Sequence, residues 1–216
     1  MDAKTIIAKR VAQEFRDGYV VNLGIGIPTL AADFLPAGVR VILQSENGFV
    51  GLSPLQGEAD ADLTNAGGKP VSIAAGGAVF DSAMSFAIIR GGHVDVTVLG
   101  ALEVDQEGNL ANWMVPGKLV PGMGGAMDLV SGAKKVVVAM EHTAKDGLPK
   151  ILRMCSLPLT GSRVVDIIVT NLCVFAVTDK GLLLKELAPG VTAQDVRANT
   201  AAEFAIADDL SIMRLA

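Results

Sequence analysis

The chain has 216 residues, half of them hydrophobic and 19% charged, with a formal net charge of −5. This length suits one large domain with a substantial core. The mildly acidic balance argues against nucleic acid or an anionic membrane surface as the main partner. No apolar run approaches the roughly 18 residues that predict a membrane-spanning helix.

The N-terminus and the cysteines predict a cytoplasmic protein without a metal. The first residues open an amphipathic segment rather than a basic stretch followed by an apolar signal core. Cys155 and Cys173 are far apart and have apolar neighbours, so free thiols in a reducing compartment are favoured over a disulfide. Neither cysteine has metal-ligand spacing with His93 or His142, and we expect no metal site.

In chain order, the pattern begins with a helix over 3–16, capped by Asp2, with Ile6, Ile7, Val11 and Phe15 on one face. Pro28 suits the first position of a second helix that ends near residue 36. Further helices are expected over 81–90, 126–131 and 192–199. The apolar runs that predict strands are 19–23, 39–44, 71–75, 94–99, 136–140, 164–170, 173–177 and 182–187.

These elements predict a single α/β domain over residues 1–216, with a mostly parallel or mixed central sheet flanked by helices. Runs of Val and Ile with little alternation indicate strands that are covered on both faces. Strands alternate with helices in the first hundred residues, which is typical of a parallel sheet. Short turns in the later half, such as the one at 179–181, predict antiparallel additions.

Glu46 follows the predicted strand 39–44 and precedes a glycine turn. In open α/β sheets, reactive groups gather just beyond the carboxyl ends of strands. A solvated turn residue would give the same string. The neighbours favour chemistry, because Asn47 offers an amide donor, and Gly48 leaves room beside apolar side chains. A carboxylate in such a partly dry cleft is a candidate covalent nucleophile.

Two glycine clusters are candidate binding loops. The first, at 22–29, begins like a dinucleotide fingerprint but has Thr29 in place of the third glycine, so Gly26 marks either a tight turn or a backbone that approaches a ligand. The second, at 116–128, leads into a short helix. The N–H groups near Gly124 and Gly125 could bind an oxyanion, although a surface loop has the same composition.

Two further features leave alternatives open. Trp113, the only tryptophan, could line a pocket or anchor its loop. Residues 140–147 combine Glu141, His142, a lysine and an aspartate, which is compatible with acid–base catalysis, but a charged solvated turn produces the same string. The Gly-x-Ser-x-Gly motif of a nucleophile elbow is absent from the sequence.

Taken together, these strings resemble the β subunit of the class I (3-oxoacid type) CoA-transferases, in order and over nearly the whole chain. One departure is Ser53, where the family pattern usually has Gly. The matching segments are 24–29, 45–48, 65–67, 90–93, 109–113, 124–129, 140–142 and 157–161.

The resemblance implies the CoA-transferase fold, which is NagB–RpiA-like, and makes Glu46 the catalytic glutamate. Its carboxylate would attack an acyl-CoA to give a mixed anhydride and then an enzyme–CoA thioester. Coenzyme A is then a substrate, and no cofactor is expected. Gly124 and Gly125 become the oxyanion candidates, and Asn47 and Gly26 become candidate substrate-binding residues.

The resemblance also implies a separate α subunit, in an α2β2 assembly or a multiple of it, acting on an acyl-CoA and a short-chain carboxylic acid. The 113–118 loop resembles relatives that act on acetoacetate and short fatty acids more than those that act on 3-oxoadipate. An acyl-CoA hydrolase on the same scaffold is an alternative enzyme. A scaffold subunit that shapes a partner's site is the non-enzymatic alternative.

Overall fold

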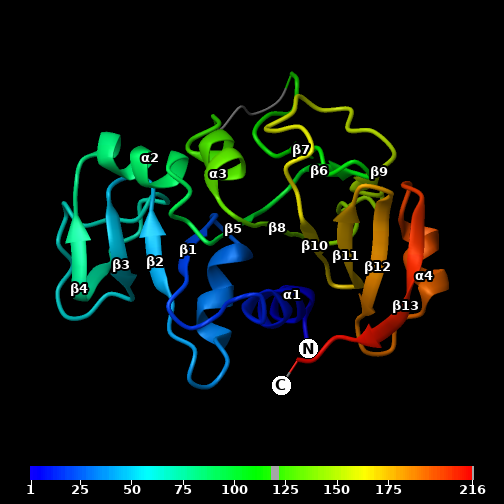
Figure 1. The fold of residues 1–216 in the computed structure, drawn as a ribbon, viewed down its shortest axis with the longest axis horizontal. Coiled ribbons are helices and arrows are strands. Elements are labelled where there is room, and N and C mark those ends of the chain that lie inside the picture. The colour runs from blue at the N-terminus through cyan, green and yellow to red at the C-terminus, as the bar shows by residue number, and fades with distance from the viewer. Residues whose placement is uncertain (118–121, 216) are drawn as a thin grey trace.

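The computed structural model describes residues 1–117 and 122–215. In this part of the chain a ten-stranded sheet has the strand order β13-β12-β11-β10-β8-β5-β1-β2-β3-β4, and a small second sheet has the order β7-β6-β9 (Figure 1). The first half comprises α1 (Ala3–Ala12), β1 (Val20–Leu23), η1 (Pro28–Phe34), β2 (Ile42–Ser45), β3 (Phe49–Ser53), β4 (Ser72–Val79), α2 (Ser82–Arg90) and β5 (Val96–Leu99). The remainder comprises β6 (Glu103–Asp105), β7 (Leu110–Ala111), α3 (Ala126–Gly132), β8 (Val136–Ala139), β9 (Ile151–Leu152), β10 (Ile167–Val169), β11 (Cys173–Thr178), β12 (Gly181–Leu187), α4 (Ala193–Asn199) and β13 (Phe204–Ile212).

The centre of the large sheet is parallel, and its flanks contain antiparallel pairs. Strands β10, β8, β5, β1 and β2 run parallel to one another. Strand β3 is antiparallel to both β2 and β4, and β11 is antiparallel to both β10 and β12. The predicted α/β architecture, with its mixed sheet and later antiparallel additions, is therefore confirmed.

Both faces of the central strands are covered, as their apolar runs predicted. In β8, Val137 packs in the cluster that contains Ile7 and Val11 of α1, whereas Val136 and Val138 pack in the cluster that contains Ile89 of α2 and Leu129 of α3. All four residues of β8 are buried. Figure 1 shows α2 and α3 near the ends of β1 and β2 at the top of the view.

The helices form where the sequence predicted them, with two differences. Helix α1 ends at Ala12 instead of residue 16, because the N–H groups of Gln13, Glu14 and Phe15 each bond three residues back and tighten the last turn. The segment begun by Pro28 is a 3-10 helix rather than an α-helix.

Several strands were missing from the prediction, and all lack a long apolar run. Strand β3 is interrupted by Gly51. The strand predicted over 71–75 is present as β4, but it continues beyond residue 75 through two glycines. Strand β13 lies at the sheet edge and carries Asp208 and Asp209 among largely exposed positions. The strands of the second sheet have only two or three residues each. The sequence pattern predicts such strands poorly, because they form through pairing with neighbouring strands and not through a periodic run of apolar residues.

Both cysteines are free, as predicted, and Cys173 is fully buried. Burial, together with Asp105 and Glu103, raises the pKa of the Cys155 thiol to about 12. Burial raises the pKa of Cys173 to about 12 as well. Both thiols are thus held in the unreactive protonated form. Across the described residues, no helix combines the length and the apolar character that crossing a membrane requires.

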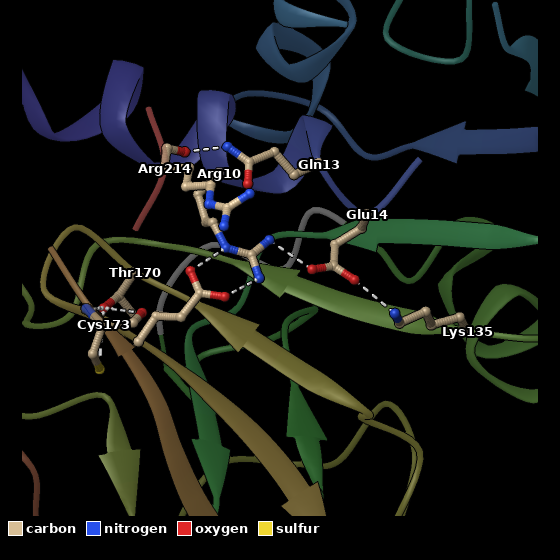
Figure 2. Close-up of polar contacts among 8 residues, drawn as sticks. Arg10, Gln13, Glu14, Lys135, Thr170, Cys173 and Arg214 are labelled. Carbon is tan, nitrogen blue, oxygen red and sulfur yellow. Dashed lines mark hydrogen bonds and ion pairs between the residues drawn. The ribbon is translucent and has the colours of Figure 1, made fainter. Parts of the chain in front are cut away.

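A buried ion network fixes α1 to the sheet (Figure 2). The Arg10 guanidinium donates to both carboxylate oxygens of Glu186 at 2.6 and 2.7 Å and to Glu14 at 2.6 Å. Lys135 donates to the other oxygen of Glu14 at 2.6 Å. Burial opposes the charge of Glu14, but the hydrogen bond from Lys135 and the charge of Arg10 outweigh it and lower its pKa. Gln13 and Lys9 also bind the carbonyl groups of Arg214 and Leu215, so the C-terminal segment lies against α1.

We predict that Arg10→Met destabilises the chain by about 3–5 kcal/mol, because it leaves buried carboxylates without their cation. Arg40→Met is the matched control, since Arg40 is 92% exposed and lies 4.0 Å from Asp17; its effect should stay within about 0.5 kcal/mol. Urea unfolding measures both values. Similar losses for the two variants would contradict the structural role of the network.

Candidate active site

Glu46 stands in the tight turn between β2 and β3, and its side chain is half-buried. The turn requires glycine at position 48, where φ is +133° and an added Cβ would lie 2.3 Å from the carbonyl oxygen of Phe80. The Gly48 N–H donates to the Ser45 carbonyl, and the Gly48 carbonyl accepts from Phe80. Glu46 is therefore held where the prediction placed it, just past the carboxyl end of a central strand.

A loop formed by residues 64–67 braces this turn. The Ser45 hydroxyl donates to Asn47 Oδ1 at 2.6 Å and accepts from the Ala66 N–H at 3.2 Å. The Asn47 amide donates to the carbonyl of Thr64 at 2.7 Å. The amide of Asn47, which we expected to serve the substrate, is thus engaged in holding the loop to the turn.

The side chain that contacts the Glu46 carboxylate is Asn22, in the neighbouring strand β1. Its Nδ2 donates to Glu46 Oε2 at 3.1 Å and to Gln44 Oε1 at 2.7 Å, and it also lies 3.3 Å from the Gln44 backbone carbonyl. Asn22 is 1% exposed, and its Oδ1 has no hydrogen-bond partner among the described residues. No donor in those residues contacts Glu46 Oε1, so one carboxylate oxygen is held and the other is available to react.

Asn22 was part of the first glycine cluster, but the sequence pattern alone assigned it no role. The available signal was a polar residue in an otherwise apolar strand of four residues. Buried amides usually have hydrogen-bond partners that explain their presence. The parallel register pairs Asn22 with Gln44, which sets Glu46 two residues beyond, within reach of the amide.

Gly125 packs directly against Glu46. A Cβ atom added at Gly125 would lie 3.1 Å from Glu46 Cγ and 3.5 Å from the ring of Phe86. Gly125 directly precedes α3 as its N-cap residue, and its carbonyl accepts from the Leu129 N–H. Within 1–117 and 122–215, no acceptor bonds the N–H groups of Gly124 or Gly125. The structure thus joins the second glycine cluster to the glutamate, 79 residues away in the sequence.

The other glycines expected at the site are farther from the carboxylate. Gly124 is exposed with φ +54°, and Gly26 is exposed with φ +97°; neither would bring an added Cβ within 4 Å of another atom. The Gly26 carbonyl accepts from the Thr29 hydroxyl, which makes it part of a turn. Residues 118–121 of the second cluster lie outside the described residues.

Trp113 anchors its loop. Its indole N–H donates to the Leu159 carbonyl at 3.2 Å. Beside it, Asn112 Oδ1 accepts from the Thr160 hydroxyl at 2.6 Å. The loop that leads to the second glycine cluster is therefore attached to the segment 157–161.

His142 is a core residue, not part of the candidate site. Its ring nitrogens lie 2.9 Å from the hydroxyl groups of Thr170 and Thr200, and only 1% of the residue is exposed. Burial lowers the pKa of His142 to about 4. The neighbouring Glu141 is exposed. In the described part of the chain, no cluster of three His, Cys, Asp or Glu side chains is arranged to hold a metal ion.

Comparisons with known proteins bear on the family of this chain. The family model described as Coenzyme A transferase matches residues 4–199. The beta subunit of the acetate CoA-transferase of Escherichia coli strain K12 is 59% identical over 99% of both chains. This chain belongs to the coenzyme A transferase family. A probable subunit of the succinyl-CoA:3-ketoacid coenzyme A transferase of Bacillus subtilis strain 168 is 52% identical, over 97% of this chain and 98% of its own.

One solved structure of the same fold is much longer than this coenzyme A transferase chain. The acyl-CoA transferase YdiF from Escherichia coli O157:H7 superposes with a TM-score of 0.81 and 28% identity. The match covers 99% of this chain but only 44% of YdiF. The chain thus spans less than half the length of that transferase.

We predict that Gly125→Ala lowers kcat at least about tenfold, because its methyl group would press on Glu46 Cγ and displace the carboxylate. Gly100→Ala is the control: an added Cβ there meets nothing within 4 Å, and its φ is outside the left-handed region. Steady-state transfer assays with folded protein decide the comparison. Equal activities in the two variants would contradict a close approach of Gly125 to a catalytic Glu46.

We predict that acid weakens the fold through His142. Between pH 6.5, the ordinary histidine pKa, and about 4, the unfolded chain binds a proton that the folded chain does not. Stability therefore falls as the pH decreases through this window, by about 3 kcal/mol in total. His142→Asn should be less stable at pH 7 but should lose this part of the pH dependence in urea unfolding. An unchanged pH dependence would contradict the assignment.

Proposed function

We propose that this chain is the catalytic β subunit of a CoA-transferase that moves CoA between a short-chain acyl-CoA and a carboxylic acid, with Glu46 as the covalent nucleophile. The observation that carries the proposal is the convergence at Glu46 of a strand end, the Asn22 donor and the close backbone of Gly125. The family match and the names of the relatives support the same chemistry.

The first half-reaction needs a carboxylate with one accessible oxygen. Glu46 Oε1 attacks the thioester carbonyl, the C–S bond breaks, and a mixed anhydride and the CoA thiolate form. The thiolate then attacks the glutamyl carbonyl, which gives a glutamyl–CoA thioester and releases the donor acid. The acceptor acid reverses these steps. One carboxylate replaces another, so little thioester free energy is lost.

Two groups of the chain are suited to the charges that develop. When the thiolate attacks the glutamyl carbonyl, negative charge grows on the oxygen that Asn22 already contacts. The N–H groups of Gly125 and Gly124 are the candidate donors for the thioester oxygen of the substrate. Donors already in place cost no reorganisation, and loss of one typically costs a hundredfold or more in rate.

The surroundings of Glu46 limit access of water to the anhydride. Gly125 lies against the Glu46 side chain, and the ring of Phe86 lies beside Gly125. The turn that carries Glu46 is tied to the loop 64–67. Because a mixed anhydride hydrolyses readily, such cover favours transfer to a thiol over hydrolysis.

We further propose a companion α subunit, in an α2β2 assembly or a multiple of it. Two relatives that match almost end to end are named as subunits. YdiF, in which this chain matches 44% of the length, has room for a second unit in the same polypeptide. Acetate and 3-oxoacids such as acetoacetate are the acceptors that the names of the relatives favour.

The test is replacement and trapping of Glu46 in the complex with the α subunit. Glu46→Ala should abolish transfer, because no other described carboxylate contacts Asn22. In the native protein, acyl-CoA followed by borohydride should reduce the thioester at Glu46, which peptide mass spectrometry detects. Glu141→Ala, at an exposed carboxylate outside the site, is the control. Transfer that survives in Glu46→Ala would leave only a scaffold role.

A hydrolase on the same scaffold makes a different prediction. It would release free acid and CoA from acyl-CoA at the same rate with or without an acceptor acid. A transferase forms a new acyl-CoA in proportion to the acceptor.

A further inference from the structure

Behind Glu46, buried polar groups form one continuous chain of hydrogen bonds from α2 to the carboxylate. Ser85 Oγ donates to the Ser45 carbonyl at 3.3 Å, and Gln44 Nε2 donates to Ser85 Oγ at 3.0 Å. Asn22 Nδ2 donates to Gln44 Oε1 at 2.7 Å and to Glu46 Oε2 at 3.1 Å. Ser85, Asn22 and Gln44 are 0%, 1% and 4% exposed.

The direction of donation along these hydrogen bonds is set by the group farthest from Glu46, the Ser45 carbonyl. A backbone carbonyl can only accept, so the Ser85 hydroxyl donates to it and its oxygen accepts from the NH₂ group of Gln44. The carbonyl end of Gln44 must then face Asn22. Asn22 meets it with its own NH₂ group, which also lies 3.3 Å from the Gln44 backbone carbonyl and donates to Glu46. Each amide has one donor end and one acceptor end, so the Ser85 hydroxyl orients Gln44, and the side chain and backbone carbonyl of Gln44 together orient Asn22.

The opposite orientation of the Asn22 and Gln44 amides would pair one more buried acceptor, so the observed hydrogen bonds must outweigh that gain. Asn22 Oδ1 is buried without a partner among the described residues, and a rotation of both amides would give it the Gln44 NH₂ group. That rotation would place a carbonyl oxygen against the Glu46 carboxylate and remove the donor from the glutamyl carbonyl. An unpaired buried acceptor is costly. The unpaired Asn22 Oδ1 is the consequence of directing the Asn22 N–H toward Glu46.

We propose that Gln44 and Ser85 are positioning residues that hold the Asn22 amide with its N–H, rather than its carbonyl, against Glu46. The inference rests on the proposed function, because it concerns the same carboxylate. Neither residue touches the reacting atoms. In this role their effect on the rate passes through Asn22, which the double-mutant cycle below tests.

The test is a double-mutant cycle in the enzyme assembled with its α subunit. Ser85→Ala should lower kcat about fivefold with little change in KM, since it removes one hydrogen bond of ordinary strength. Asn22→Ala should lower kcat on the order of a hundredfold. In the Asn22→Ala background, Ser85→Ala should have no further effect on kcat. A merely structural role for Ser85 would instead give independent, additive losses.

Two further variants complete the design. Gln44→Met should behave as Ser85→Ala does, with an effect that also vanishes without Asn22, and it decides the question if Ser85→Ala fails to assemble. Thr97→Val is the control, because Thr97 is opposite Asn22 in β5 and its buried hydroxyl has no partner among the described residues. Its kcat should remain within about twofold of the native value.

The positioning role and the proposed function can fail separately. Native kcat in both Ser85→Ala and Gln44→Met, or additive effects in the cycle, would overturn the positioning role. If Glu46→Ala is inactive in the same assay, the proposed function stands even then. If Glu46→Ala retains transfer, the proposed function itself is wrong.

Discussion

The hydrogen bond from Asn22 to Glu46, across the parallel pair β1 and β2, is the contact on which the rest of the site depends. It exists because the register sets Asn22 opposite Gln44, with Glu46 two residues farther along. Strand β1 is also paired with β5 on its other side and is covered on both faces. A slip of one residue would turn every side chain of the strand to the other face, so the core fixes this register. Packing far from the carboxylate therefore determines which group it meets.

The same constraint explains why backbone geometry matters so much here. The turn after β2 is closed by Gly48 and braced through Ser45 and Asn47, and the Glu46 side chain projects from it. Gly125, which directly precedes α3, contacts that side chain; α3 packs in the same hydrophobic cluster as α2. The proposed nucleophile is thus positioned by a central strand pair and a glycine turn, and only the contact with Gly125 comes from a segment distant in sequence.

The sequence predicted the architecture and the position of Glu46 because both follow from local signals: long apolar runs, helix caps and a strand that ends in a glycine turn. It also made Gly125 a candidate site residue, through composition, and its contact with Glu46 comes only from the structure. The roles of Asn22 and Ser85 escaped because each is a single polar residue in an element that otherwise suggests packing. Asn47 was assigned from its type, and the loop that occupies its amide is visible only in three dimensions. At His142 the sequence suggested either acid–base catalysis or a solvated turn, and the structure shows a buried core residue beside an exposed Glu141.

The small number of hydrogen bonds to the Glu46 carboxylate suits the proposed mechanism, in which this carboxylate must attack a thioester. A carboxylate that accepts several hydrogen bonds is well held but less able to attack, because its lone pairs are engaged. Within the described residues, Asn22 is the single donor, and it binds only Oε2. In the proposed mechanism, Oε1 attacks the thioester, while Oε2 already has the donor that the glutamyl carbonyl needs later. The unpaired Oδ1 of Asn22 is then intelligible: in the described part of the chain, the fold tolerates one unsatisfied acceptor there in order to aim one N–H.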